Sequence, residues 1–514
     1  MKPQVSWAWY RPSVADALFL IIALMGLRGA RHTLLDDPGL GWHIRNIDAI
    51  LEQGWWLRFD PFTDPRYLPS AMYYTNQWLG DVPYWLGWRW AGLEGVAAVN
   101  AVTLALLASL LYRILLADGL PWAVALVWAA LGMNGTSCSW NARPNVFSLV
   151  GILLVGRACF LIQEGRLSRG WFAGLVILLA AWANVHGGFL AGLLTLGLTF
   201  AIQVALFVGS LEQESRLRAR QATLVAGALI FSCGAATLVN PYGVDLYRWT
   251  LMLLGDPFFM DLHQEWRSPD FHSGGAMRYE LLLLLFPLML GLSQRRPGAV
   301  ELIVAVTWLH LALTGFRYVA LWVLVAVPVM ARQSVEIPYL IEITRRLGLN
   351  SAPDSLFHTA TPRAPWAISV VMGLVILGGA KFIQGRLVVH KQEILATQAM
   401  DQLIALAREH WDRTGERPLL LHGYDWGGYL IWHAWPDLMN YMDDRNEVQG
   451  RRRIEEYFDV MQAKPGWEPL LAGVDLVCLP AKAPLVSQLA QRPAEWAERY
   501  RDTFGVVFER VPAQ

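Results

Sequence analysis

The sequence predicts a mostly α-helical, polytopic membrane protein of about eleven transmembrane helices, with a small α/β domain at its C-terminal end. Composition is the first reason: 55% of the 514 residues are hydrophobic and 16% are charged, whereas soluble domains are about a quarter charged. The second reason is a series of long apolar segments before residue 386. The third is the alternation of strand-like and helical segments after that residue, which is typical of an α/β layer.

Apolar segments of near-spanning length recur along the first three quarters of the chain. A membrane-crossing helix needs about 20 apolar residues, and several segments are shorter, so their ends and their number are approximate. The first segment has no small-residue cleavage signal, so we interpret it as a retained helix and not as a signal peptide. The segments cover residues 13–35, 94–116, 121–139, 145–163, 170–184, 188–209, 221–239, 279–293, 299–315, 317–331 and 365–383.

Basic residues lie in alternate connections between these segments, and this pattern predicts the orientation of the chain. Because arginine and lysine are enriched in cytoplasmic loops, we expect a cytoplasmic N-terminus, a cytoplasmic linker at 332–364 and an extracytoplasmic C-terminal domain. The opposite connections hold nearly all the unusual polar motifs. The basic residues are Arg113, Arg166, Arg169, Arg216, Arg218, Arg220, Arg295, Arg296, Arg332, Arg345 and Arg346.

The first outer loop, residues 36–93, is long and amphipathic. Ile44, Ile47 and Ile50 recur at helical spacing with charged residues between them, which predicts a helix that lies in the membrane interface. A second interfacial helix is predicted at 77–91, where tryptophans recur on related faces. The prolines between the two helices favour an extended or turning segment.

Residues 386–514 are predicted to form a soluble outer domain, separate from the transmembrane domain of residues 1–385. Strand-like segments, at 418–422, 475–479 and 505–508, alternate with helical ones. The glycine-rich stretch 423–428 could bind an anion at a helix N-terminus, but it lacks a nucleotide-binding spacing, so we interpret it as a structural turn. Asp443-Asp444-Arg445 could line a site, but we interpret it as a solvated loop.

Net charge and cysteine content argue against some classes of function. The formal net charge is zero, so no basic surplus is available for binding nucleic acid. The four cysteines are scattered singly, at Cys138, Cys159, Cys233 and Cys478. This spacing predicts neither a zinc site nor a disulfide framework.

Two adjacent carboxylates, Asp36 and Asp37, follow the first apolar segment directly, and His43 lies six residues beyond them. Carboxylates are costly near lipid and often mark functional sites there. A close pair also tends to split its pKa values, which suits proton abstraction. The alternative is an acidic pair that simply ends a helix in water. We favour a catalytic pair because His43 and a long outer loop accompany it.

Arginines at the outer ends of helices are the candidates for phosphate binding. A guanidinium binds a phosphate in a bidentate fork, whereas snorkelling to lipid headgroups is the structural alternative. The candidates are Arg143, Arg267, Arg278 and Arg317, of which Arg143 and Arg317 lie closest to apolar segments.

Histidines and a glutamate in other outer connections are further candidates. His186 lies between Asn184 and two glycines and is either a ligand or a packed histidine. Asp37, His263 and Glu265 could hold a divalent metal, Mg²⁺ or Mn²⁺, but no recognised metal-ligand spacing is present. No cofactor is therefore predicted, with the metal kept open as an alternative.

Three first-loop motifs resemble the first outer loop of the GT-C superfamily of polytopic membrane glycosyltransferases. These are Asp37-Pro38…Trp42-His43, Asp60-Pro61-Phe62-Thr63 and Gln77-Trp78-Leu79. Other short motifs resemble an uncharacterised bacterial branch related to protein O-mannosyltransferases and aminoarabinose transferases. They are Arg143-Pro144, His186-Gly187, Asn240-Pro241-Tyr242-Gly243, Glu265-Trp266-Arg267-Ser268-Pro269 and Trp426-Gly427-Gly428-Tyr429-Leu430-Ile431-Trp432.

The resemblance implies an inverting transfer of a sugar from a polyprenyl-phosphate donor to a glycan, lipid or protein acceptor, on the outer face of a bacterial inner membrane. It places the catalytic aspartate at Asp37. Gln77 departs from the acidic residue that related sequences often carry there, so either Glu265 or Asp81 substitutes or activity is altered. A transporter or flippase of lipid-linked glycan and an inactive scaffold are the alternatives. The predicted substrate-binding residues are His43, Arg143, His186, Glu265, Arg267 and Arg317.

Overall fold

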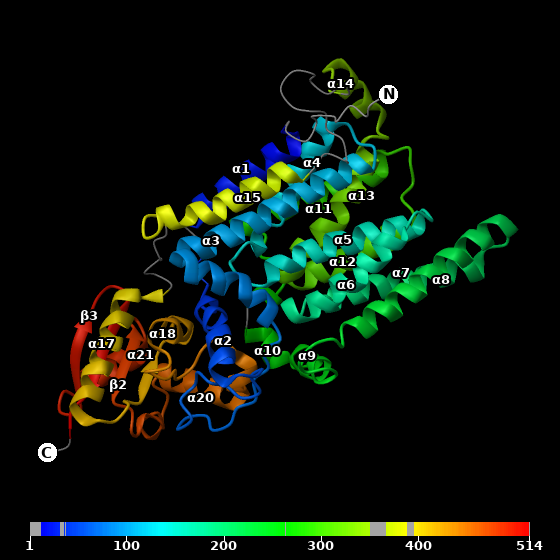
Figure 1. Ribbon diagram of the computed structural model, residues 1–514. Helices are drawn as coiled ribbons and strands as arrows, with labels where there is room; N and C mark the ends of the chain where they lie inside the picture. The colour runs from blue at the N-terminus through cyan, green and yellow to red at the C-terminus, as the bar shows by residue number, and fades with distance from the viewer. Residues whose placement is uncertain are drawn as a thin grey trace.

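A bundle of long helices forms most of the molecule, and a small sheet with its own helices lies at one end (Figure 1). The molecule is seen here as a computed structural model, which describes residues 12–30, 35, 37–262, 264–349, 366–387 and 395–512. Of the predicted site residues, Asp36 and His263 lie outside the described residues. Most of the predicted linker beyond residue 349 also lies outside them.

A helix occupies each of the predicted apolar segments. Five helical segments are long and apolar enough to cross a membrane: α3, α5, α7, α8 and residues 316–334. The mostly helical membrane fold is thereby confirmed, while the number of spans stays a prediction. The helices are α1 (Val14–Gly29), α3 (Trp78–Ala117), α4 (Trp122–Gly135), α5 (Asn145–Gln163), α6 (Arg169–Val185), α7 (Phe189–Gly209), α8 (Gln213–Ala236), α11 (Gly274–Leu292), α12 (Ala299–Thr314), α13 (Val319–Ser334) and α15 (Ala367–Gly379).

The centre of the bundle is α13, which is buried along almost its whole length. Its own Trp322 and Trp308 of α12 are among the largest fully buried side chains. By contrast, α8 and α15 expose leucine and valine side chains, as expected of helices whose outer faces meet lipid. Shorter helices connect the bundle at its ends: α9 (Asp245–Gly255), α10 (Pro257–Leu262) and α14 (Pro338–Arg346).

The helix α3 is kinked where the predicted interfacial helix meets the predicted span. Ala91 and Gly92 leave helical geometry, and Gly92 adopts a φ of 63°, which favours glycine. The segment before the kink is the helix predicted at 77–91, and the segment after it is the predicted span at 94–116. The kink lets one continuous helix change direction.

The helix α2 (Leu40–Gln53) corrects a prediction. It lies between α3 and α18 (Gly427–Ala434), so its apolar side chains Ile44, Ile47 and Ile50 are buried against protein and do not face lipid. Only the end of the helix, from Leu51, is exposed. An amphipathic pattern shows that one face is buried but not what buries it.

The C-terminal residues form the predicted small mixed sheet with helices around it. Its strands have the order β1-β2-β4-β3, with β1 and β2 parallel and the other pairs antiparallel. The sequence did not predict β3 because its charged residues suit an exposed edge strand. The elements are α17 (Thr397–Thr414), β1 (Leu420–His422), α18, α19 (Asn446–Gln449), α20 (Arg451–Met461), β2 (Leu476–Pro480), α21 (Pro484–Ala490), β3 (Trp496–Arg501) and β4 (Gly505–Arg510).

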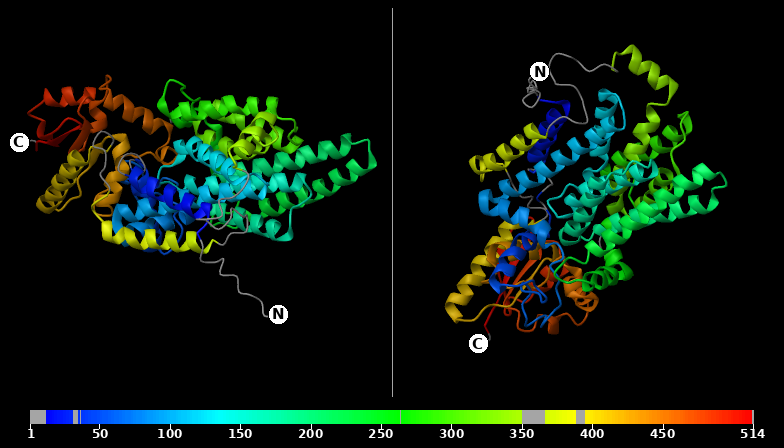
Figure 2. Two further views of the ribbon diagram at one scale, coloured as in Figure 1. Left: turned by 90° about the horizontal axis from the view of Figure 1, so that it is seen from above. Right: turned by 45° about the vertical axis from the view of Figure 1, so that its right-hand side comes forward.

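The first outer loop is hydrogen-bonded to the C-terminal residues, and the two lie side by side in all views (Figures 1 and 2). The Asn440 N–H donates to the carbonyl of Phe62 at 2.8 Å, and its carbonyl accepts from Asp64. Arg445 is fully buried between Asp443 and Asp60, with its nearest oxygens at 2.6 and 2.7 Å. The prediction of a solvated loop at 443–445 is therefore wrong.

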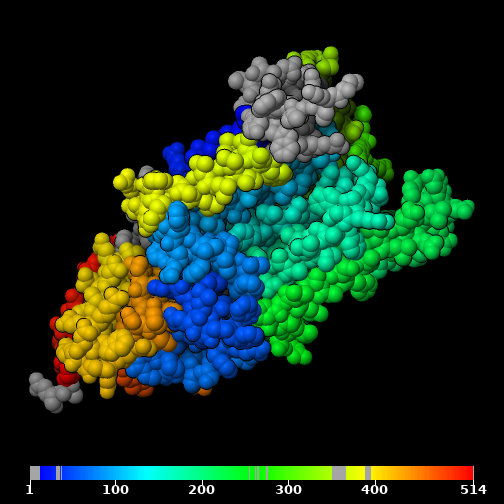
Figure 3. All heavy atoms as spheres, viewed as in Figure 1, coloured from blue at the N-terminus to red at the C-terminus, as the bar shows by residue number. Residues whose placement is uncertain are grey.

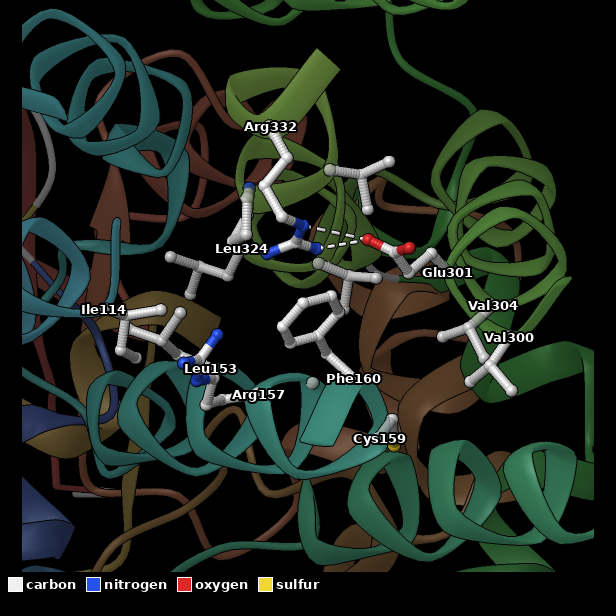
Figure 4. Close-up of a pocket in the computed structure, with 14 residues that line it drawn as sticks. Ile114, Leu153, Arg157, Cys159, Phe160, Val300, Glu301, Val304, Leu324 and Arg332 are labelled. Atoms are coloured by element: carbon white, nitrogen blue, oxygen red, sulfur yellow. Dashed lines mark hydrogen bonds and ion pairs between the residues drawn. The ribbon is translucent and has the colours of Figure 1, made fainter. Parts of the chain in front are cut away.

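Buried ion pairs lie between α5, α12, α13 and the C-terminal end of α3, and Figure 4 shows the pair that Arg332 forms with Glu301. Arg332 contacts Glu301 at 2.6 Å and Asp118 at 2.5 Å, and Arg157 also contacts Asp118. Arg157, Glu301 and Arg332 line a cavity of about 30 Å³, roughly the size of one or two water molecules. Two arginines face two carboxylates, so the buried charges balance.

Candidate functional site

The guanidinium of Arg143 lies among three carboxylates that come from distant parts of the chain. Its Nε atom contacts Asp37 in the first outer loop. Its Nη2 atom lies 3.1 Å from Asp444 of the C-terminal residues, and its Nη1 atom lies 3.8 Å from Glu265. Arg143 itself immediately precedes Pro144 and α5. One partly buried guanidinium thus joins four segments of the chain.

The carboxylates of Asp37 and Asp444 are held in place by further donors. The Gly39 N–H donates to Asp37 Oδ1 at 2.8 Å, and the Trp42 indole N–H donates to Asp444 Oδ1 at 2.8 Å. Burial raises the pKa of Asp444 to about 6; Arg143 opposes the rise and the negative charge of Asp37 adds to it. Asp444 therefore holds its proton to a higher pH than an ordinary aspartate does.

Two glycines bring the C-terminal residues onto the first loop. A Cβ atom on Gly41 would lie 1.8 Å from the carbonyl oxygen of Gly428, and one on Gly428 would lie 1.8 Å from that of Pro38. The backbones of α2 and α18 therefore cross in direct contact, which only glycine allows. This supports the structural interpretation of the glycine-rich stretch 423–428.

The same stretch places one more carboxylate near the site. Burial raises the pKa of Asp425, and the negative charge of Asp37 adds to the effect. Asp425 and Asp444 both come from segments that we interpreted as a turn and a solvated loop. Their approach to Asp37 depends on the crossing of α2 and α18, so no local sequence signal could have identified them.

His43 is held by a buried chain of hydrogen bonds. Its Nδ1 atom lies 2.7 Å from Asp81 of α3, whose other oxygen accepts from Asn46 at 2.9 Å. Asn46 in turn accepts from the Tyr73 hydroxyl at 2.9 Å. Asp81 therefore orients His43 and does not face Asp37. Of the two residues proposed to compensate for Gln77, only Glu265 approaches the partner of Asp37.

His186 presents a neutral imidazole beside the site. Its Nδ1 atom accepts from the Gly188 N–H at 3.0 Å and lies 2.9 Å from the Ser148 hydroxyl. Because Nδ1 accepts, the ring proton is on Nε2. Burial lowers the pKa of His186 to about 3, and the positive charge of Arg317 adds to the effect. The ring can donate one hydrogen bond without carrying charge.

Arg317 stacks on an aromatic ring just before the N-terminal end of α13. Its guanidinium lies 3.9 Å from the centroid of the Trp266 ring, a cation–π geometry. Within the described residues it forms no ion pair. Arg267 contributes its carbonyl, which accepts from the Phe316 N–H at 2.8 Å, while its side chain is exposed. Arg317 thus has more unpaired charge to offer a phosphate than Arg143, whose nitrogens face carboxylates.

The arrangement of the described side chains does not indicate a metal centre. Within the ranges that the structure describes, no three His, Cys, Asp or Glu side chains are placed to hold a metal ion. Asp37 and Glu265 face the guanidinium of Arg143, which stands where a cation would balance them. The third residue of the alternative, His263, lies outside the described residues. The donors present do not fit the metal alternative.

The fold is similar to that of solved glycosyltransferase structures. One is an archaeal oligosaccharyltransferase, AglB from Archaeoglobus fulgidus, in complex with an inhibitory peptide and a dolichol-phosphate; the TM-score is 0.57 at 12% identity, over 96% of this chain and 74% of that chain. Another structure of the Archaeoglobus fulgidus oligosaccharyltransferase, tethered with an acceptor peptide, gives 0.54 at 12% identity, over 97% and 74%. The chain therefore resembles these oligosaccharyltransferase structures in fold over nearly its whole described length.

A further structural likeness is to ArnT from Cupriavidus metallidurans bound to undecaprenyl phosphate. Its TM-score is 0.46 at 14% identity, over 97% of both chains. No protein-family model and no curated protein matches the chain. The sequence identities are low, so the likeness concerns the fold.

Proposed function

We propose that the protein is a membrane glycosyltransferase that moves a sugar from a polyprenyl-phosphate donor to an acceptor hydroxyl or amide at the outer face. The observation that carries the proposal is the largely buried cluster of Asp37, Arg143 and Asp444, in which Arg143 stays partly exposed, within a GT-C-like fold. Charged groups that converge in this way from distant segments are costly to bury and typical of functional sites.

In the proposed reaction, Asp37 accepts the proton of the acceptor while the acceptor's nucleophilic atom attacks the anomeric carbon of the sugar. The bond between that carbon and the phosphate oxygen breaks, and polyprenyl phosphate leaves with the electron pair. Attack from the face opposite the leaving group inverts the anomeric configuration. Arg143 and the Gly39 N–H hold the carboxylate of Asp37 in position.

The leaving phosphate gains negative charge, so it needs donors that are free to approach it. Arg317 supplies a guanidinium without an ion-pair partner among the described residues, and His186 supplies a neutral N–H. Arg143 is better placed to fix the carboxylates than to bind phosphate. This assignment modifies the phosphate-binding role that the sequence predicted for Arg143.

The acceptor is proposed to enter between the first outer loop and the C-terminal residues. Asp444 and Asp425 approach Asp37 from that side, so a bound acceptor would contact both parts. The AglB structures, which share the fold, contain a dolichol-phosphate in one case and an acceptor peptide in the other. Those ligands support a lipid-phosphate donor and an acceptor bound at one site.

The test is release of polyprenyl phosphate from synthetic polyprenyl-phosphate sugars by the purified full chain, measured by mass spectrometry. Asp37→Asn is expected to lower the rate at least a hundredfold, the lower end of general-base contributions. The matched control is Asp245→Asn, on the exposed first turn of α9. Undiminished release by Asp37→Asn would overturn the catalytic role. Absence of release from every donor by the unmodified chain would favour the inactive scaffold.

A further inference from the structure

The short helix α14 lies at the end of the bundle opposite to the sheet, at the edge of the molecule (Figures 1 and 3). It has nine residues, and none of them is buried. Its sequence nevertheless carries large apolar side chains. Exposed apolar side chains that gather on one surface often mark a site where a protein or a membrane binds.

Most of the apolar side chains of α14 lie on one side of the helix. Leu340, Ile343 and Leu347 are three and four residues apart, so they share that side. Tyr339 precedes Ile343 by four residues and extends the same side. Tyr339 is 80% exposed, Ile343 50% and Leu347 65%. This apolar side is therefore largely uncovered.

The opposite side of α14 is charged. Arg345 Nε donates to Glu342 at 2.9 Å, and Arg346 Nε donates to the same carboxylate at 2.6 Å. Ile341 is the apolar exception on this side, four residues before Arg345, and it is 45% exposed. One apolar and one charged side, with basic residues on the charged one, is the pattern of helices that lie in a membrane interface.

The connection to α13 fixes the depth of α14 in the bilayer. Residues 316–334 are long and apolar enough to cross a membrane, and only residues 335–337 separate them from α14. Three residues reach at most about 11 Å, and here they form a turn, because the Glu336 N–H donates to the Gln333 carbonyl at 3.0 Å. Each headgroup region of a bilayer is about 5–8 Å thick. The helix α14 therefore begins at the membrane surface.

Leu340 shows which way the apolar side faces. It packs against the apolar core of the bundle, as Val335 does before it. Ile343 and Leu347 follow on the same side, about one and two turns later, and are half exposed or more. The side that contacts the bundle at Leu340 must therefore meet, further along, what surrounds the bundle. For a bundle of membrane-spanning helices, that is lipid.

We propose that α14 lies on the membrane surface, with Tyr339, Ile343 and Leu347 among the lipid chains and the Glu342–Arg345 pair in water. The partner of its apolar side is the bilayer and not another protein, because this side faces along the spanning helices at the depth of the headgroups. Burial of apolar surface drives the contact, so no particular headgroup is required. The inference does not depend on the proposed sugar transfer.

The test uses a nitroxide spin label on the full chain in phosphatidylcholine nanodiscs. Its collisions with oxygen, which dissolves in lipid, are compared with those with a nickel chelate, which stays in water. The label is attached at Ile343→Cys or, as the matched control, at Ile341→Cys, the same residue type with similar exposure on the opposite side. Cys138 is replaced by serine, since the other native cysteines are buried. We expect oxygen to be favoured several-fold at Ile343→Cys and the nickel chelate at Ile341→Cys.

A second measurement separates membrane contact from a structural role. Ile343→Asp is expected to speed hydrogen exchange of the α14 amides in nanodiscs several-fold, while Ile341→Asp leaves it nearly unchanged. Neither side chain is buried in the protein, so the thermal unfolding midpoint should stay the same in both variants. Similar collision ratios at the two labelled positions would overturn the proposal. Exclusion of both reagents from Ile343→Cys would overturn it too, because protein would then cover this side.

Equal exchange rates in the two aspartate variants would also contradict it.

Discussion

Arg143 Nη2 lies 3.1 Å from Asp444 Oδ2, although 301 residues separate the two along the chain. The contact joins the start of α5 to the C-terminal residues, and the Nε atom of the same guanidinium contacts Asp37. The proposed site is therefore made by the bundle, the first outer loop and the C-terminal residues together. A substitution at this site in any one of these three parts should therefore change the geometry of the other two.

Asp444→Asn should change how stability depends on pH. The pKa of Asp444 is raised on folding from 3.8 to about 6, so the folded state holds this proton more tightly than the unfolded state. The resulting stabilisation is present below about pH 4 and is lost as the pH rises through about 6. It amounts to at most about 3 kcal/mol. Asparagine does not titrate, so the variant does not lose stability in this way as the pH rises. The difference between its unfolding midpoint and that of the unmodified chain should therefore increase between pH 4 and 7.

Thermal unfolding at several pH values checks this, with Asp459→Asn as control. Asp459 is half-exposed and pairs with Lys464 on the far side of α20. Its substitution is not expected to reproduce the relative rise between pH 4 and 7. A pH-independent difference between Asp444→Asn and the unmodified chain would contradict the prediction.

Gly428→Ala should separate α18 from α2. The added methyl group would lie 1.8 Å from the Pro38 carbonyl oxygen, so the two backbones must move apart. We expect a loss of several kcal/mol, as in overpacked cores, and faster proteolysis of the first outer loop. Gly234→Ala is the control, because a Cβ there meets no atom within 4 Å and alanine favours a helix. Equal stability of both variants would argue against the close crossing.

Asp81→Ala should destabilise the protein more than Asp81→Asn. Alanine leaves the Nδ1 atom of His43 and the amide of Asn46 without their buried acceptor, and a broken buried pair typically costs about 3–5 kcal/mol. Asparagine keeps one acceptor oxygen and the shape. Denaturant unfolding of both variants measures the difference. If His43 does not depend on Asp81, the two substitutions will have the same effect.

His186 should stay neutral throughout the physiological pH range. Burial lowers its pKa to about 3, so the imidazole gains no proton between pH 5 and 8. In protein labelled with ¹⁵N-histidine, its two ring nitrogens should keep constant chemical shifts over that range. His186→Gln identifies the signals by their disappearance. A titration midpoint between 5 and 8 would show that the side chain is solvated.

Arg317→Gln should weaken use of the lipid-phosphate donor. A hydrogen bond to a charged group contributes about 1.5–3 kcal/mol, so we expect kcat/KM for the donor to fall about tenfold to a hundredfold. Arg278→Gln is the control, since Arg278 is exposed and donates to the Ser137 hydroxyl. Kinetics at varied donor and saturating acceptor measure both. Similar losses in the two variants would remove the special role of Arg317.

The sequence was sufficient for features that depend on local pattern. The segment 145–163 was predicted with the bounds of α5 because Pro144 and Glu164 enclose an uninterrupted apolar run. The pattern predicted that one face of α2 is apolar. It could not show whether lipid or the helix α18 covers that face. The burial of Asp444 could not be predicted from the sequence, for a further reason. Its burial depends on a contact 301 residues away, and its own neighbours in sequence are charged.

The crossing of α2 and α18 at Gly41 and Gly428 has a consequence for biosynthesis. The first loop leaves the ribosome long before α18, yet Asp37 meets Asp444 only after both are on the same side of the membrane. A chain that stops before residue 427 would insert its helices without completing the charged cluster around Arg143. The cell would then hold an inserted but incomplete protein, with Trp42 and Arg143 lacking Asp444 as partner. Completion of the site thus waits for the last quarter of the chain.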